Sequence, residues 1–441
     1  MSYKSKGTDS PSLDGVVLVG QYETARDQGL FNANKRIKTM RKTIFGCLGA
    51  AAVAFALQFT TANAQASLFG LGACDPCGEA ICDPCGDVDG CGPSLGKWFI
   101  NGHMEAGFFA NAHGAKNTIE EGIRFPGNNP MMEYDIAGPN NTRLTGGQIN
   151  QIYVSAGRSV DGKRGLDFGG TVDFTWGSDA FWAQSVGLEA NAGNDYRGWG
   201  GGDYYAAFAQ AYTEVEYGRL NVKVGKFYAP FGIDSYKSTE NFFYSWNPAM
   251  NIIPTTLGGF NATYKVNNNL SVFGGWAVPT IGETSKDNAF LGGFDWSRNR
   301  LNVHYAYLIG KDSSIATKYF FNSLTTTYQV SKRVKYVFDW SLANYNFEGA
   351  GNLSEYSLMN EVIYTHNKKW AYGLRFGMTS DNFYDADFNT VSLGANWTPN
   401  KWLLVKPEIR YDWNNDGEVM FGKAADKTYQ FSGGMSAVVK F

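Results

Sequence analysis

Histidine, the side chain most often used for proton transfer, is rare and scattered in this chain. The four histidines are His103, His113, His304 and His366, and no two of them stand four residues apart as a helical metal pair would. The sequence also lacks the H-E-x-x-H motif and a complete Walker motif. We therefore predict no catalytic residue, no metal site, no cofactor and no enzyme activity.

Cysteines cluster early in the chain, where the pentapeptide CDPCG occurs twice. The clustered cysteines are Cys74, Cys77, Cys82, Cys85 and Cys91. Two C-x-x-C pairs could bind zinc as thiolates, but the spacing between these pairs is shorter than in common zinc patterns. In an exported chain the compartment is oxidising, which favours disulfides or intermolecular crosslinks. We predict a disulfide or crosslink role, with zinc as the alternative.

Charged and aromatic residues gather in a long connection, 229–256, between two alternating stretches. Connections of this length are uncommon in compact domains unless they are functional. The charged residues are Asp234, Lys237 and Glu240, and the aromatic residues are Phe242, Phe243, Tyr244 and Trp246. Charges of both signs in a narrow passage set ion selectivity. We predict that this loop narrows a water-filled lumen and that its aromatic rings fix it to the wall; an extracellular loop without a role in a pore is the alternative.

The segment from Lys97 to the end alternates apolar and polar residues in strands of about ten residues. The pattern is clearest at 166–176, 334–342, 370–378 and 403–413. Hydrophobic residues make up 44% of the chain, yet no apolar run reaches the ~20 residues that a membrane-spanning helix needs. Apolar surface is therefore carried by strands. The net charge of −3 and the lack of a basic patch argue against nucleic acid as a partner.

Short turns alternate with long links along these strands. The short turns are predicted at 161–162, 218, 267–269, 298–299, 331–332, 367–368 and 399–400. The long links are predicted at 111–147, 178–203, 229–256, 279–288, 310–318, 345–355, 380–387 and 414–427. Seven turns and eight links join about sixteen strands, and both ends of the strand region fall on the short-turn side. The connection 229–256 then follows strand five.

An export signal is predicted at 40–64. Positive charges after Met40 precede an apolar stretch at 44–57 and an Ala-x-Ala site, which are the three parts of a secretory signal peptide. We predict cleavage between Ala64 and Gln65. Residues 1–39 are then an upstream extension that is either untranslated or disordered, or part of a longer signal region. Residues 65–96 form a cysteine-rich periplasmic linker, and 97–441 form the strand domain.

Two architectures share this period-two pattern, a soluble β-sandwich and an outer-membrane β-barrel. The export signal favours the barrel, as does the placing of aromatic residues such as Trp98, Trp370 and Trp402 near strand ends. The chain also stops on Phe441, at the end of an alternating strand, which resembles the assembly signal of outer-membrane proteins. We predict an all-β, antiparallel, up-and-down transmembrane barrel.

Short motifs inside 219–266 point to a family. They are Gly225-Lys226-Phe227, Pro230, Gly232, Asn241-Phe242-Phe243-Tyr244-Ser245, Pro254 and Ala262-Thr263-Tyr264. On these residues the stretch resembles the porin-like outer-membrane barrels described as β-barrel porin type 2. Family members often carry an acidic residue shortly after the glycine; Asp234 would take that place, although Ile233 stands where an aromatic residue is expected. The resemblance implies passive passage of solutes, without naming a solute.

The expected function is therefore a bacterial outer-membrane channel for passive diffusion of small hydrophilic solutes or ions, with both termini in the periplasm. Its expected partners are the lipid bilayer, the barrel assembly machinery and further copies in a homotrimer. The predicted lumen residues are Asp167, Asp173, Glu214, Glu216, Lys223, Lys335, Asp339, Arg375, Glu408 and Arg410. The alternative is a structural or adhesive barrel, crosslinked through its cysteine segment.

Overall fold

The computed structural model describes most of the chain from Lys97 onward. The described residues are 97–112, 123–124, 133–134, 146–185, 188–190, 199–201, 204–278, 288–312, 317–347, 349, 351–381, 386–415 and 427–441. Almost all of them fall in one compact unit. The upstream extension, the signal peptide and the cysteine segment lie outside the described residues.

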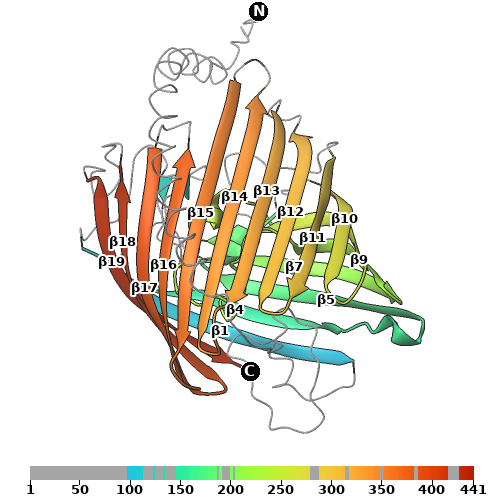
Figure 1. Ribbon diagram of the computed structural model, residues 1–441, viewed down its shortest axis with the longest axis horizontal. Helices are drawn as coiled ribbons and strands as arrows, with labels where there is room; N and C mark the ends of the chain where they lie inside the picture. The colour runs from blue at the N-terminus through green and yellow to red at the C-terminus, as the bar shows by residue number, and fades with distance from the viewer. Residues whose placement is uncertain are drawn as a thin grey trace, which may run out of the picture. The chain divides into compact units, whose positions relative to one another are not determined.

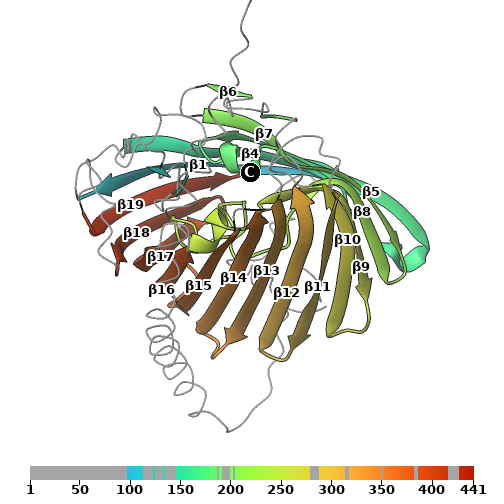
Figure 2. The same cartoon turned by 90° about the horizontal axis from the view of Figure 1, so that it is seen from above.

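Among the described residues, sixteen strands form a closed antiparallel barrel, as predicted (Figures 1 and 2). The first eight are β1 (Trp98–Asn111), β4 (Gly146–Arg158), β5 (Leu166–Gly177), β7 (Tyr204–Tyr217), β8 (Leu220–Tyr228), β9 (Thr256–Lys265), β10 (Leu270–Val278) and β11 (Ala289–Arg298). The other eight are β12 (Leu301–Asp312), β13 (Thr317–Gln329), β14 (Val334–Phe347), β15 (Gly351–Thr365), β16 (Trp370–Asp381), β17 (Ala386–Asn400), β18 (Leu403–Asn414) and β19 (Tyr429–Lys440). β1 pairs with both β4 and β19, which closes the ring.

Minor elements lie in the long links, except for η1, which lies in the short turn between β4 and β5. They are the two-residue strands β2 (Ile123–Arg124) and β3 (Glu133–Tyr134), the strand β6 (Gly200–Gly201), the helix α2 (Ala180–Ala183) and the 3-10 turns η1 (Gly162–Arg164) and η2 (Pro248–Asn251). β6 pairs with the start of β7, so the predicted link 178–203 adds a short strand to the sheet there. None of the described helices is long and apolar enough to span a membrane.

Turns and links fall at opposite ends of the strands. The positive φ angles of Gly218 and Asn299 mark two of the short turns, at 60° and 55°. β1 begins and β19 ends at the short-turn end, and the final residue closes the barrel there, because Gly102 and Phe441 exchange backbone hydrogen bonds of 3.0 and 2.9 Å. The seven short turns and the strand count agree with the prediction.

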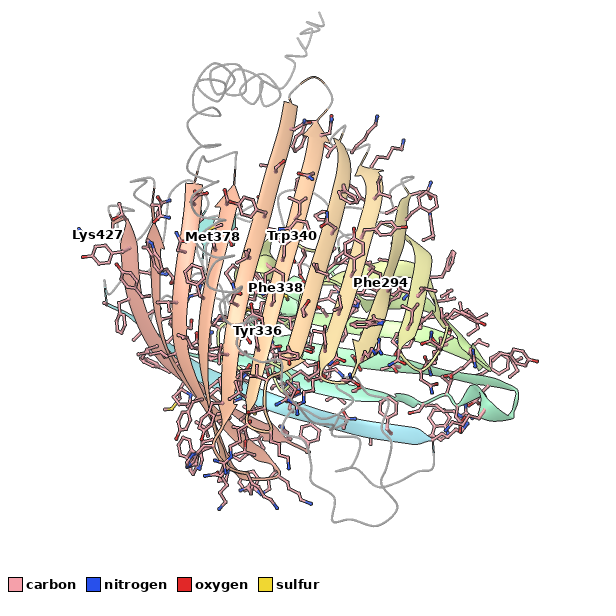
Figure 3. The ribbon with its side chains drawn as sticks, in the orientation of Figure 1. Phe294, Tyr336, Phe338, Trp340, Met378 and Lys427 are labelled. Atoms are coloured by element: carbon pink, nitrogen blue, oxygen red, sulfur yellow. The ribbon has the colours of Figure 1, made fainter. Side chains whose placement is uncertain are left out.

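Side chains alternate between a polar inside and an apolar outside. Along β18, Lys406, Glu408 and Arg410 are buried, whereas Ile409 is 48% exposed. Figure 3 labels Tyr336, Phe338 and Trp340 along β14; they are opposite in parity to the buried Asp339 and Ser341, which face inward. A soluble sandwich has the reverse arrangement, so this polarity identifies a membrane barrel.

Two glycines shape the strands on either side of the longest described link. Gly225 of β8 is paired with Gly259 of β9, and both have positive φ angles, 134° and 146°. A Cβ at Gly225 would lie 2.3 Å from the carbonyl oxygen of Ala211, and one at Gly259 would lie 2.1 Å from that of Trp276. Only glycine fits this conformation at this spacing. The connection from β8 to β9 leaves the sheet just beyond the pair.

Candidate constriction inside the barrel

The connection between β8 and β9, residues 229–255, lies inside the barrel, and we call it the inner loop. The backbone amide of Ile233 donates to Asp339 of β14 at 2.8 Å, and that of Ser245 donates to Glu408 of β18 at 2.8 Å. Three strands separate β14 from β18 in the sheet, so the inner loop bridges distant parts of the inner surface. Figure 2 shows it as the yellow-green segment within the ring of strands.

A third attachment runs to β4. The side-chain amide of Gln151 donates to the carbonyl oxygen of Tyr236 at 2.8 Å, and its oxygen accepts from the amide of Ser238 at 3.2 Å. From β18, the ammonium group of Lys406 donates to the carbonyl oxygen of Ser238 at 2.8 Å. One turn of the inner loop is therefore held between β4 and β18.

Ser245 joins the inner loop to three buried charges. Its hydroxyl donates to Glu408 at 2.6 Å and accepts from Arg410 at 3.0 Å and from Arg375. Its carbonyl oxygen also accepts from Arg375, at 2.8 Å. Hydrogen bonds to charged groups are roughly twice as strong as those between neutral groups. These directional hydrogen bonds therefore fix the position of the inner loop at Ser245.

The buried charges beneath Ser245 neutralise one another. Arg375 lies 3.2 Å from Glu408 and 4.0 Å from Glu361, and Lys406 lies 3.2 Å from Glu105. Buried charges persist only when they are paired and hydrogen-bonded, because removing them from water is costly. The pairs connect four strands, β1, β15, β16 and β18, under the inner loop.

Two aromatic rings of the inner loop pack directly against glycines of the barrel wall. A Cβ at Gly373 of β16 would lie 2.3 Å from Cε1 of Phe242, and a Cβ at Gly394 of β17 would lie 2.9 Å from Cδ1 of Phe243. The guanidinium carbon of Arg375 lies 4.4 Å from the centre of the Phe243 ring, close enough for a cation–π contact. The missing side chains of these glycines make room for both rings.

The next two aromatic residues of the inner loop are fully buried. The ring of Tyr244 covers Gly107 of β1, where a Cβ would lie 2.3 Å from the hydroxyl oxygen, and that hydroxyl donates to Asn150 at 3.1 Å. Trp246 packs edge-to-face on Trp182 of α2, with ring centres 5.9 Å apart. The inner loop and the link between β5 and β7 therefore support each other.

The opposite part of the inner surface holds the loop by apolar packing. Phe231, Ile252 and Ile253 of the inner loop are buried in one hydrophobic cluster with residues of the wall. The wall residues of this cluster include Phe273, Ala277, Ala289, Leu291, Ala306, Leu308, Tyr319, Phe321 and Ala343. They come from β10 to β14. This side adds apolar burial to a few hydrogen bonds, such as that from the amide of Gly232 to the hydroxyl of Ser323 at 2.9 Å and that between His304 and the carbonyl oxygen of Pro230 at 2.9 Å.

Asp234 stabilises the inner loop through a hydrogen bond within the loop. Its carboxylate accepts from the amide of Asn247 at 2.6 Å, and the side chain of Asn247 donates to Asp339 of β14 at 3.0 Å. Desolvation inside the barrel raises the pKa of Asp234, while the nearby charge of Arg375 acts in the opposite direction. Asp234 therefore organises the loop as well as contributing charge.

Lys237 and Glu240 form an ion pair within the inner loop, 3.6 Å apart, and both side chains are partly exposed. The ammonium of Lys237 also lies 5.8 Å from the ring centre of Tyr153. These are the accessible charges among the seven predicted constriction residues, whose four aromatic members are buried.

A hydrogen-bonded chain runs beside this pair from β1 to the β5–β7 link. His103 and Gln151 share a hydrogen bond of 2.8 Å, and the amide of Gln151 donates to Asp179 at 3.0 Å. Burial, together with Glu105, raises the pKa of Asp179 to about 8. Asp179 is therefore mostly neutral at neutral pH and adds little negative charge to the lumen.

The predicted lumen residues lie at two levels. Those beside the inner loop are buried: Asp173, Asp339, Arg375, Glu408 and Arg410. Those nearer the short turns are partly exposed: Asp167, Glu214, Glu216, Lys223 and Lys335. The second group contains cross-strand neighbours of opposite charge, such as Glu214 and Lys223, and an ion pair of Asp167 with Arg158 at 2.9 Å.

Sequence reasoning missed several residues that position the loop. Ser245, Glu105 and Glu361 were not among the predicted site residues, and neither were the glycines facing the loop aromatics. Glu105 and Glu361 alternate with apolar residues on strands, so the period-two pattern could have found them. An isolated glycine inside a strand suggests close approach by another group, which could have pointed to Gly373. In the part of the chain that the structure describes, no group of three or more potential ligands could hold a metal.

Comparison with known proteins identifies the family. The family described as "Putative beta-barrel porin-2, OmpL-like" matches residues 100–441. Comparison with curated proteins gave no match.

Solved outer-membrane proteins share the fold, and three of them give the following similarities. The chain is similar to an anion-selective porin from Comamonas acidovorans, with 11% identity, a TM-score of 0.52 and coverage of 78% of this chain and 99% of that chain. It is also similar to OmpT of Vibrio cholerae lacking loop L8, at 14% identity, a TM-score of 0.50 and coverage of 78% and 99%. It is similar as well to the outer-membrane channel DcaP of Acinetobacter baumannii, with 12% identity, a TM-score of 0.50 and coverage of 78% of this chain and 97% of that chain. At these identities the likeness shows the fold alone.

The family match begins just inside β1 and runs through the last strand, so it includes every strand of the barrel and the inner loop. The polar inner face, the apolar outer face and the closed ring are those of a porin-like barrel. The chain therefore belongs to the beta-barrel porin-2 family of porin-like outer-membrane proteins.

Proposed function

We propose that this protein is a passive channel for small hydrophilic solutes or ions and that the inner loop narrows its lumen. The observation that carries the proposal is the attachment of Ser245, midway along the inner loop, to Arg375, Glu408 and Arg410 on the inward face. A loop fixed in this way reduces the cross-section of a polar, hydrated lumen. Paired charges on its rim would give a transverse field that selects among ions.

The topology supports a specific orientation in the membrane. Bacterial barrels have short periplasmic turns and long external loops. In that arrangement the short-turn end, where β1 begins and β19 ends, faces the periplasm. The predicted cysteine segment, 65–96, would then lie in the periplasm, and Phe441 would be presented to the assembly machinery from that side. Solutes diffuse through without a covalent step or a cofactor.

Single-channel conductance of the Gln65–Phe441 protein in planar bilayers tests the proposal. Two variants would be compared with it, one lacking 239–243 of the inner loop and one lacking 419–423 of the link between β18 and β19. We expect discrete conductance steps, larger steps after deletion in the inner loop, and a much smaller change after the control deletion.

Circular dichroism and heat-modifiable gel mobility would show that each protein is folded and inserted. A folded, inserted protein that gave no conductance would overturn the channel and favour the structural or adhesive barrel. Equal conductance in all three proteins would retain the channel but remove the inner loop from its constriction.

A further inference from the structure

A groove lies on the outer face of the barrel at the long-link ends of β11 to β15, with a volume of about 640 Å³. Its floor includes Phe290, Ile309 and Phe320. Each of these residues is adjacent in sequence to a buried, inward-facing neighbour, as Phe290 is to Leu291, so the groove faces away from the lumen. It is therefore separate from the site described above. Figure 1 views this part of the barrel from outside, with the long-link ends at the top.

The strand register arranges the groove in two rows. Phe290 pairs with Ile309, which pairs with Phe320, and these three form an apolar row across β11, β12 and β13. The row beyond it, nearer the long links, contains Lys311 and Lys318. Both lysines are exposed. A polar, basic row thus borders an apolar row at this end of the barrel.

The two lysines lie directly opposite each other. Lys311 and Lys318 are register partners across an antiparallel pair, and Lys318 is in turn the partner of Asn346 on β14. An anion held between these two side chains would contact both ammonium groups at once, and hydrogen bonds between charged groups are strong.

We propose that this groove binds a lipid with a phosphate-bearing headgroup, with the phosphate between Lys311 and Lys318 and an acyl chain along the apolar row. The assignment rests on the orientation proposed above, which places the long-link end in the outer leaflet. Basic residues at the level of lipid headgroups bind anionic lipids. A free phosphate would satisfy the lysines but would leave Phe290 and Ile309, which are 61% and 50% exposed, without a partner.

The test measures binding of lipid A, a phosphorylated glycolipid, to the detergent-solubilised barrel by native mass spectrometry. The variant is Lys311→Gln with Lys318→Gln. The matched control is Lys368→Gln with Lys369→Gln, which removes the same charge from exposed positions in the turn between β15 and β16 at the other end of the barrel. We expect about thirty-fold weaker binding in the variant, equal to about 2 kcal/mol for two basic residues near a headgroup, and no change in the control.

A second measurement uses thermal unfolding. Lipid A should raise the melting temperature of the wild type more than that of the variant. Equal lipid affinity in variant and wild type would overturn the proposal, and so would equal binding of lipid A from which the phosphates have been removed. Inorganic phosphate that reproduced the stabilisation at the same concentration would show a phosphate site without a lipid.

Single-channel conductance should be unchanged in the variant, so failure of the lipid site is distinguishable from failure of the proposed channel.

Discussion

Two parts of the inner surface hold the same loop by different chemistry. One, which we call the polar wall, comprises the inward residues of β16 to β18 and of β1 and β4, and it binds the loop through groups such as Arg375 and Glu408. The other, the apolar wall, comprises the apolar inward residues of β10 to β13 with Ala343, and it packs against Ile252 and Ile253. The polar wall thus holds the loop mainly by charged hydrogen bonds, whereas the apolar wall holds it mainly by packing, beside a few hydrogen bonds such as that from Gly232 to Ser323.

The two walls contribute differently to holding the inner loop: one adds mainly binding energy, and the other also fixes the position of the loop. Apolar contact is non-directional and scales with area, so the apolar wall can hold the loop without fixing its register. Charged hydrogen bonds are directional, so the polar wall decides where Ser245 lies. Nε of Arg375 and Nη2 of Arg410 are buried without a partner among the described residues, and such groups require water or a solute.

The largest expected effect comes from Arg375→Met on the polar wall. The change leaves Glu408 and the carbonyl oxygen of Ser245 without their cationic partner. Breaking a buried pair by removing one member costs about 3–5 kcal/mol. We expect faster hydrogen exchange in the inner loop, noisier single-channel currents and a shifted reversal potential. Arg298→Met, at the exposed turn between β11 and β12, is the control. Unchanged exchange in the inner loop would remove the polar wall from its role in positioning.

Ile253→Ala tests the apolar wall. Replacing a buried isoleucine by alanine costs about 2–5 kcal/mol, and we expect the lower part of that range because neighbouring apolar side chains of the loop can move into the space. Hydrogen exchange in the inner loop should increase, but the reversal potential should stay the same, because no charge moves on the polar wall. Ile409→Ala, on the outer face, is the size-matched control. A shifted reversal potential in Ile253→Ala would break the proposed division between the two walls.

Most of the barrel could be predicted because its signals are local. The period-two alternation at 166–176 and 403–413 places β5 and β18, and turn residues at 218 and 298–299 separate adjacent strands. Each strand carries its own pattern, so the strand count and the inward face of β18 follow without knowledge of distant contacts. The pattern alone does not say which face points inward; a polar inner face was predicted because the export signal and the aromatic residues near strand ends favour a membrane barrel.

The details of the loop site could not be predicted because its partners are far apart in sequence. Ser245 is 130 residues from Arg375 and 163 from Glu408, and no local pattern connects them. Phe242 was expected to fix the loop to the wall, but its position opposite Gly373 depends on how the closed ring places β16. The run of aromatic residues allowed the loop to be identified from the sequence. Which wall residues these aromatic side chains contact depends on how the closed barrel arranges its strands.

The smallest expected effect concerns the accessible charge on the inner loop, at Lys237. Because Lys237 and Glu240 are both partly exposed, their pair should contribute only ~0–1 kcal/mol, so Lys237→Gln should leave thermal unfolding almost unchanged. The reversal potential should still move toward cation preference, since one positive charge leaves the lumen. The shift should shrink as salt rises from 0.1 M to 1 M, because the screening length falls from about 10 Å to about 3 Å.

Exchanging the two charges, by Lys237→Glu with Glu240→Lys, should shift the reversal potential less, because the pair is only 3.6 Å apart and its net charge is unchanged. Lys368→Gln, on a short turn, is the control. A salt-independent shift, or an equal shift in the control, would place Lys237 outside the ion path and leave the polar wall alone to set selectivity.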